Sequence, residues 1–287
     1  MASKKQRQRQ LARARYERRI QKDVDRHRRN KRMATGLTAA VAVLAIAGGG
    51  TALALTVGSS PKSAASDAAA KTPSATPSAT PSASPTPSTV PAMVDGKCQY
   101  IKGGTAAKKV SVPSATPDTK ATYKATMKTS RGDIVIDLAN SKAPCTVNSF
   151  VSLADQGYFN NTHCHRLTTS QIFVLQCGDP TGTGDGTPGY GFGNENLPTA
   201  ASSGEATYAT ATVAMANTGQ PDSNGSQFFL VYKNSPLPPN YTDFGTIVSG
   251  LNILQNVARA GSDNSNGPGD GHPKDKVQIN SMTITKT

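Results

Sequence analysis

Residues 121–138 read ATYKATMKTSRGDIVIDL, and this pattern indicates the fold class of the C-terminal part of the chain. Apolar side chains at Ile134, Ile136 and Leu138 alternate with polar ones, which is the period of a half-buried β-strand. A turn that contains glycine, at 130–133, separates this strand from the one before it. The stretch therefore predicts an antiparallel β-hairpin.

The sequence after this hairpin predicts short strands and two helices. APCTVNSFVSLADQGYF (143–159) reads as a helix, with Pro144 in its first turn and Gly157 at its C-terminal end. Strands are predicted at 163–167, 171–177, 208–216, 226–232 and 242–248, and a second helix near 250–257. In the last strand the apolar parity changes between Ile279 and Met282, which indicates a β-bulge. This pattern favours a mainly β protein, an antiparallel barrel capped by helices.

The positive charge of the 287-residue chain is concentrated at its N-terminus. Residues 1–32 hold 14 of the 31 Lys and Arg residues and 3 of the 18 Asp and Glu residues, so residues 33–287 carry a net charge of only +2. A nucleic-acid-binding fold usually carries its basic residues on a folded face. We therefore expect no nucleic-acid partner and interpret 1–32 as a basic tail.

An uncharged run at 33–60 contains LTAAVAVLAIAGGGTALALTV, about the length that crosses a ~30 Å hydrocarbon core. It predicts one transmembrane helix over 33–58. Because basic residues precede it, the positive-inside rule places 1–32 in the cytoplasm and the rest of the chain outside the cell, anchored to the cell membrane. A buried soluble helix and a cleaved signal peptide, with Ala52-Leu53-Ala54 as the cleavage motif, are the alternatives.

The segment after the predicted membrane helix is rich in Pro, Ser, Thr and Ala. Its composition over 59–95 cannot bury a core, so it predicts a disordered, extended linker. Residues 96–120 form a transition segment, and the sequence leaves open whether it packs on the domain that follows. The predicted folded domain is 121–287, long enough for one hydrophobic core.

Three segments carry the motifs that point to function: CHRLTTSQIFVLQCGDPTGTGDGTPGYGFGNE (164–195), MANTGQPDSNGSQFFLVY (215–232) and SPLPPNYTDFGTIVSG (235–250). Their His-Arg pair, QxGDPTGxG run, Met-Ala-Asn and Asn-Gly-Ser-Gln-Phe-Phe blocks occur in the order found in cyclophilins, which are peptidyl-prolyl cis/trans isomerases. The chain resembles this family over 121–287. The resemblance implies a closed eight-stranded antiparallel β-barrel capped by two helices, with no cofactor and no metal.

Rotation about an X-Pro bond needs a donor rather than a nucleophile. The planar amide has a rotational barrier of ~18–20 kcal/mol, and the prolyl nitrogen regains a lone pair when the bond is twisted. A guanidinium aimed at that lone pair stabilises the twisted state more than the planar one. By its place in the family motif, Arg166 is the predicted donor.

The resemblance implies roles for ten further residues. An apolar pocket for the proline ring falls to Phe173, Val174, Phe229 and Leu237. Gln176, Asn217 and Gln227 are expected to form hydrogen bonds with the substrate backbone or with the arginine. His165 is expected to position Arg166 and to have no acid–base role. Of these, Gln176 and Phe173 are assigned to catalysis beside Arg166. The expected substrate-binding residues are His165, Val174, Asn217, Thr218, Gln227, Phe229, Leu237 and Tyr241.

The sequence departs from the usual family pattern near this site. It has two extra residues in 167–172, and it has no tryptophan. Tyr241 stands where a histidine is common, and Thr218 where an alanine is common. We therefore expect weaker binding of cyclosporin-type cyclic peptides, with the fold retained.

The four cysteines, Cys98, Cys145, Cys164 and Cys177, permit disulfides in a compartment outside the membrane. If Arg166 and Gln176 share one face of a hairpin, Cys164 and Cys177 lie on opposite faces, which disfavours a bridge between them. Cys145 with Cys164 or with Cys177 is the favoured pairing, and free buried thiols remain the alternative.

These observations predict a membrane-anchored isomerase that acts on proline-containing exported polypeptides. One alternative function is a low-turnover module that binds proline-containing peptides as a scaffold or chaperone with the same pocket. In a third interpretation, the basic tail carries the function and the barrel does not. The sequence gives no oligomeric state.

Overall fold

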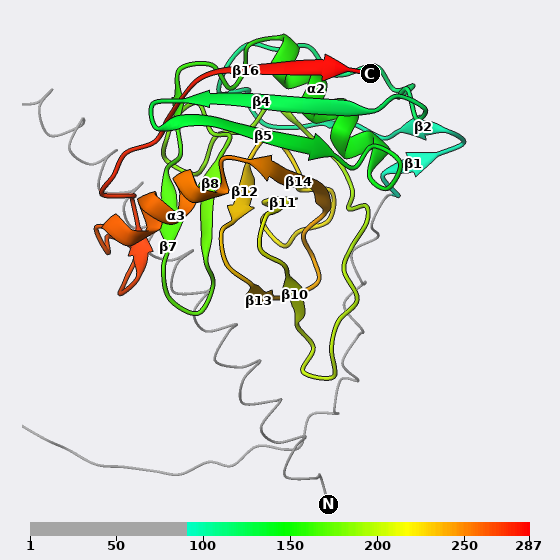
Figure 1. Ribbon diagram of the computed structural model, residues 1–287. Coiled ribbons are helices and arrows are strands. Elements are labelled where there is room, and N and C mark those ends of the chain that lie inside the picture. The colour runs from blue at the N-terminus through cyan, green and yellow to red at the C-terminus, as the bar shows by residue number, and fades with distance from the viewer. Residues whose placement is uncertain (1–90) are drawn as a thin grey trace, which may run out of the picture. The chain divides into compact units, whose positions relative to one another are not determined.

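The computed structural model of the chain describes residues 91–287 (Figure 1). The predicted basic tail, the predicted transmembrane helix and nearly all of the predicted linker lie outside the described residues. Within 91–287, neither helix has the length and apolarity that a membrane span requires.

Ten antiparallel strands form the main sheet. The edge strands, β15 (Asp270–Gly271) and β6 (Thr162–His163), do not pair with each other, so the sheet is open and curled, and the expected closed eight-stranded barrel is wrong. Strand β7 (Arg166–Thr168) pairs with β8 (Val174–Cys177) on one side and with β15 on the other, so β15 ends the sheet there, while β6 pairs with β16 (Gln278–Lys286) at the other end. The strand order is β15 (Asp270–Gly271), β7 (Arg166–Thr168), β8 (Val174–Cys177), β12 (Phe228–Val231), β11 (Thr212–Met215), β14 (Asp243–Ser249), β5 (Gly132–Leu138), β4 (Tyr123–Thr129), β16 (Gln278–Lys286) and β6 (Thr162–His163).

Several local predictions are confirmed. Strands β4 and β5 form the hairpin, and Figure 1 shows β16 beside β4. Helix α2 (Pro144–Asp155) begins with Pro144, and Gly157 follows it with a φ of +65°. Helix α3 (Leu251–Ala260) is the second predicted helix. The register of β16 against β4 shifts between Ile279 and Ser281, as the parity change indicated. The strand predicted at 208–216 is instead divided between β10 (Ala206–Tyr208) and β11.

Along β8, β11 and β12, successive side chains point to opposite faces of the sheet. One face contributes fully buried residues such as Leu175, Val213 and Leu230 to the main core, which also contains the apolar face of α2. The other face contributes to a smaller cluster with β10 and β13 (Ser235–Leu237), which pair with each other. This cluster contains Val174, Ala206, Tyr208, Ala214, Phe229, Val231 and Leu237.

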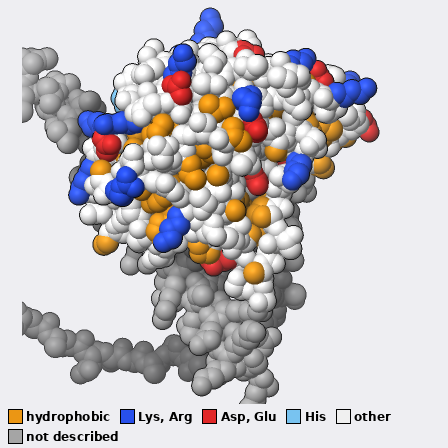
Figure 2. Space-filling view, viewed as in Figure 1, with side chains coloured by type: hydrophobic (Ala, Val, Ile, Leu, Met, Phe, Trp, Pro, Cys, Tyr) orange, Lys and Arg blue, Asp and Glu red, His pale blue; other side chains and the backbone are white. Residues whose placement is uncertain are grey.

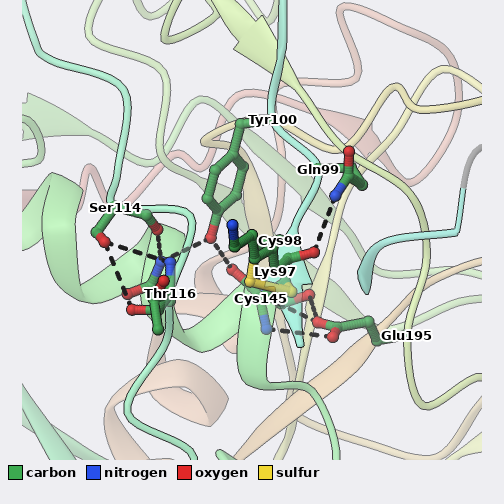
Figure 3. The surroundings of a disulfide bond; sticks show 10 residues. Lys97, Cys98, Gln99, Tyr100, Ser114, Thr116, Cys145 and Glu195 are labelled. Carbon is green, nitrogen blue, oxygen red and sulfur yellow. Dashed lines mark hydrogen bonds between the residues drawn. A yellow bond between two sulfur atoms is a disulfide. The ribbon is translucent and has the colours of Figure 1, made fainter. Parts of the chain in front are cut away.

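Residues 91–120, here called the N-terminal strap, pack on the domain, which the sequence left open. The strap carries β1 (Met93–Val94), β2 (Lys97–Cys98) and β3 (Ile101–Lys102), and β3 pairs with β9 (Tyr190–Gly191). Figure 3 shows Tyr100 donating a hydrogen bond from its hydroxyl to the carbonyl oxygen of Cys145, at 2.7 Å. At the start of α2, the Glu195 carboxylate accepts from the backbone N–H groups of Cys145 and Thr146.

All four cysteines form disulfides, and the pairing differs from the predicted one. Cys98 in the strap is bonded to Cys145 in α2, and Cys164 is bonded to Cys177. The predicted bridges from Cys145 to Cys164 or Cys177 are therefore wrong, and so is the alternative of free thiols. The first error arose because the sequence did not place the strap against α2.

The second error came from extending a strand pattern too far. Strand β7 begins at Arg166, so strict alternation of faces does not reach Cys164. The backbone N–H of Cys164 bonds to the carbonyl of Val277, at 3.0 Å, rather than to β8. The Cys164 side chain can therefore turn toward Cys177.

Candidate active site

A row of directly opposed residues crosses four neighbouring strands. Arg166 on β7 faces Gln176 on β8, Gln176 faces Phe229 on β12, and Phe229 faces Ala214 on β11. Opposed residues in antiparallel strands project to the same side of a sheet. The register therefore places a cation, an amide and an aromatic ring side by side on the face opposite the main core.

A cleft of about 140 Å³ lies on this row. Its apolar wall comes from the smaller cluster, and Arg166 and Gln176 supply polar groups. The lining residues are Arg166, Ile172, Val174, Gln176, Ala216, Asn217, Phe229, Leu237 and Tyr241. The sequence predicted seven of these nine, all except Ile172 and Ala216.

The Arg166 guanidinium is held from the side by Asp270 on β15. Nε of Arg166 donates to Oδ1 of Asp270 at 2.8 Å, and Nη2 donates to Oδ2 at 2.6 Å. This hydrogen-bonded carboxylate raises the pKa of Arg166 above its ordinary value. Burial raises the pKa of Asp270, but the bonds from Arg166 outweigh it and leave that pKa below its usual range. Both groups are therefore charged at neutral pH.

Gln176 is fixed by a chain of amide hydrogen bonds. Its Nε2 donates to Oε1 of Gln227 at 2.9 Å, and Nε2 of Gln227 donates to the carbonyls of Gly184 and Gly186. The turn that carries these carbonyls is organised by the buried Asp179 carboxylate, which accepts from the N–H groups of Gly184 and Gly186. Because Gln176 uses its Nε2 in this chain, its Oε1 can accept from a ligand N–H group.

Three aromatic rings support the apolar wall of the cleft. Tyr241 lies edge-on to Phe229, with ring centroids 5.4 Å apart, and Tyr208 contacts both rings. Burial raises the pKa of Tyr208 to about 12, so its hydroxyl stays protonated. That hydroxyl donates to the carbonyl of Tyr241 at 2.8 Å. The wall is therefore held by both packing and a hydrogen bond.

Two predicted residues line a neighbouring cavity instead. Thr218 and Gln227 lie on a cavity of about 220 Å³, which shares Gln176, Ala216 and Asn217 with the cleft. Because they share these residues, the cleft and this cavity are neighbours, and together they are called the groove. Asn217 is anchored on its rim by a 2.8 Å hydrogen bond from Nδ2 to the carbonyl of Asn240.

Two other predicted residues lie outside the groove. His165 is buried, and burial lowers the pKa of its imidazole, so the ring is neutral near pH 7. Phe173 points away from the cleft and packs against the main core and Tyr232, with Lys233 over its ring at 4.4 Å. Ile172 occupies the cleft in its place.

Two features of the site were missed at the sequence level. Period-two alternation from Gln176 through Val174 leads to residue 172, so the strand pattern favoured Ile172 over Phe173. Asp270 had no such signal, because it lies about a hundred residues beyond Arg166 in a turn-rich loop. Its role could be found only from the pairing of β15 with β7.

The surface around the folded part has no single sign of charge in the view of Figure 2. Lys and Arg side chains are scattered there, with Asp and Glu between them. The charge at the site is therefore local. It is the Arg166 guanidinium, held in a fixed orientation beside the small apolar cleft. This arrangement suits a ligand that has a compact apolar ring next to a polar backbone.

Comparison with known proteins gives a consistent assignment. The family model described as cyclophilin type peptidyl-prolyl cis-trans isomerase/CLD matches residues 124–284. The chain is 46% identical over 204 residues to a probable peptidyl-prolyl cis-trans isomerase B of Mycobacterium tuberculosis, covering 67% of this chain and 65% of that protein. It is 48% identical over 200 residues to the protein of the same name from Mycobacterium leprae, covering 65% of this chain and 66% of that protein.

The match therefore spans just under two thirds of the length of these mycobacterial relatives. A crystal structure of a cyclophilin type isomerase from Cryptosporidium parvum aligns with a TM-score of 0.49 and 30% identity, over 58% of this chain and 99% of that one. The family model covers more than half of the chain, and its span includes the whole row from Arg166 to Phe229. The chain belongs to the cyclophilin-type peptidyl-prolyl cis-trans isomerase family.

Proposed function

We propose that this protein is a peptidyl-prolyl cis/trans isomerase in which Arg166 stabilises the twisted X-Pro amide. The observation that carries the proposal is the placement of the Arg166 guanidinium on the rim of a small apolar cleft, directly across from Gln176. Family membership supports the same activity.

The proposed mechanism uses the cleft as a slot for the proline ring. Val174, Phe229 and Leu237 are nearly buried, so a ring that enters displaces water from apolar surface. Arg166 then donates an N–H to the prolyl nitrogen, which becomes a good acceptor only when the amide twists. A hydrogen bond made only in the transition state contributes ~3–4 kcal/mol, or roughly 10²–10³ in rate.

The amide groups hold the peptide while the bond turns. Oε1 of Gln176 accepts an N–H from the substrate backbone, and Asn217, which also lines the cleft, contacts the peptide. Fixing one side of the X-Pro bond lets the other side rotate against it. No covalent intermediate is needed.

We further propose that the protein is anchored in the cell membrane by residues 33–58, with its N-terminus in the cytoplasm and its folded part outside. The two disulfides support this location, because disulfides persist in oxidising compartments. The substrates would then be exported polypeptides that contain proline. Labelling of cysteines introduced into 59–95 in intact cells tests the topology, and shielding from an impermeant reagent would contradict it.

The activity is tested by a protease-coupled isomerisation assay of the full chain in detergent, with Arg166→Ala beside it. We expect the wild type to accelerate isomerisation and Arg166→Ala to lose about 10²-fold or more. Equal activity of the two proteins would remove Arg166 from its role. A wild type that binds X-Pro peptides without accelerating their isomerisation would favour the scaffold or chaperone module.

A further inference from the structure

We propose that Asp270 is a positioning residue that sets the orientation of the Arg166 guanidinium toward the cleft. The inference rests on the proposed isomerase function and adds to it a residue from a distant loop. Asp270 does not line the cleft, so any effect on the reaction must act through Arg166.

The geometry of the pair fixes a plane. An arginine has five N–H donors in one plane, and a carboxylate that accepts from both Nε and Nη2 removes rotation about the last side-chain bonds. The remaining N–H groups, on Nη1 and on the second position of Nη2, are then directed away from Asp270. Arg166 lines the cleft, so these are the donors available to a ligand.

Asp270 is itself fixed by a loop that is attached to β7. The backbone N–H of Thr169 bonds to the carbonyl of Gly269 at 2.7 Å, and β15 pairs Asp270 with Thr168. Gly269 has a φ of +76°, and a Cβ there would lie 2.8 Å from Cβ of Ser170. Glycine is therefore needed for the loop to approach β7 this closely.

A second contact steadies the carboxylate. Nδ2 of Asn266 donates to Oδ1 of Asp270 at 3.3 Å, and the backbone N–H of Asn266 bonds to the Asp270 carbonyl at 3.0 Å. The Asp270 side chain is about a quarter exposed and that of Arg166 about a third. An ion pair this exposed contributes little to stability. Its strict geometry thus points to orientation of Arg166 rather than to folding.

The experiment compares Asp270→Ala and Asp270→Asn with the wild-type full chain, measuring turnover and peptide affinity separately. Displacement of a catalytic group by about 1 Å costs on the order of 10²-fold, and a loosened guanidinium samples the correct position part of the time. We expect kcat to fall about tenfold in both variants, with X-Pro peptide Kd changed less than threefold. The asparagine variant keeps the shape of Asp270 but replaces an acceptor by a donor, so a packing role would leave it active.

The matched control is Asp275→Ala, which breaks the ion pair of Asp275 with Arg131, outside the groove. It should keep kcat within twofold. Arg166→Ala combined with Asp270→Ala should be no slower than Arg166→Ala alone, because Asp270 acts through the arginine.

The inference is overturned if the wild type is active and either Asp270 variant matches Asp275→Ala, or if the double variant is slower than Arg166→Ala alone. An inactive wild type would instead contradict the proposed function itself, and the positioning role with it. The two failures are distinguished by the wild-type rate.

Discussion

Replacing Cys98 and Cys145 by alanine removes the covalent link between the N-terminal strap and helix α2. The disulfide spans 47 positions of sequence, and both side chains are buried. In the chain-entropy model, closing a loop of this length stabilises the folded state by about 4 kcal/mol. For a domain of this size, that loss lowers Tm by roughly 8–16 °C.

The geometry of the cleft should stay nearly the same when this disulfide is removed. None of its lining residues belongs to the strap, and Tyr100 still packs edge-on against Tyr190 and Phe192, each with ring centroids 5.6 Å apart. We therefore expect kcat/KM of the double variant to stay within twofold of wild type at a temperature where it is folded.

The matched control is removal of the other disulfide, as Cys164→Ala with Cys177→Ala. It spans 13 positions, so the same model gives a smaller loss of about 3 kcal/mol. Cys164 lies two residues before Arg166 and Cys177 directly follows Gln176, so we expect activity to fall in this variant. Urea unfolding followed by near-ultraviolet circular dichroism measures both losses, since the chain has tyrosines and no tryptophan. A loss under about 1 kcal/mol for the strap variant would show that this disulfide does not stabilise the domain by closing a long loop.

Three further changes test the turn and the cleft. Gly186→Ala places a Cβ 1.8 Å from Oδ1 of Asp179, so it should lower the free energy of unfolding in urea by about 1–3 kcal/mol. As the control, Gly103→Ala should leave stability unchanged, because a Cβ at Gly103 would meet no atom within 4 Å. Burial raises the pKa of Asp179, but the hydrogen bonds that its carboxylate accepts outweigh this effect and hold the pKa below its ordinary value. The ionised carboxylate therefore stabilises the folded state in full above about pH 4, and this contribution is lost as the pH falls through the pKa of the folded state. The stability gap between wild type and Asp179→Asn should thus be about 2 kcal/mol at pH 7 and shrink toward pH 2; a constant gap would contradict this. Phe229→Ala should cost about 3 kcal/mol of stability and weaken X-Pro peptide binding about tenfold by calorimetry, and an unchanged affinity would exclude Phe229 from the slot.

Local patterns in the sequence were sufficient for the hairpin, the two helices and the bulge. The alternation in 121–138, Pro144 at the start of α2 and the parity change after Ile279 each act over a few residues, and each is found in the structure. The closed barrel was wrong because it depended on how the edges of the sheet meet. Pairing of β15 with β7 joins segments about a hundred residues apart, and no short pattern encodes it.

In the candidate site, too, some features could be predicted from short sequence patterns, and others depend on distant contacts. Motif order was enough to bring Arg166, Gln176 and Phe229 together, since they lie on neighbouring strands in register. The position of Phe173 could not be taken from the motif, because β8 begins only at Val174 and Phe173, just before it, packs against the main core and Tyr232. The Asp270 carboxylate and the bond between Cys164 and Cys177 depend on contacts outside regular strands.

In the proposed mechanism, Arg166 stabilises the twisted amide rather than the bound ground state. Exchange NMR of an X-Pro peptide at equilibrium with the full chain measures the catalysed cis/trans rate and the affinity in one sample. We expect Arg166→Ala to lower the catalysed rate by about 10²–10³-fold while Kd changes less than threefold, and Arg166→Lys to have a rate between those of Arg166→Ala and the wild type. An Arg166→Ala protein that binds more weakly but, once saturated, exchanges the peptide at the wild-type rate would contradict this mechanism.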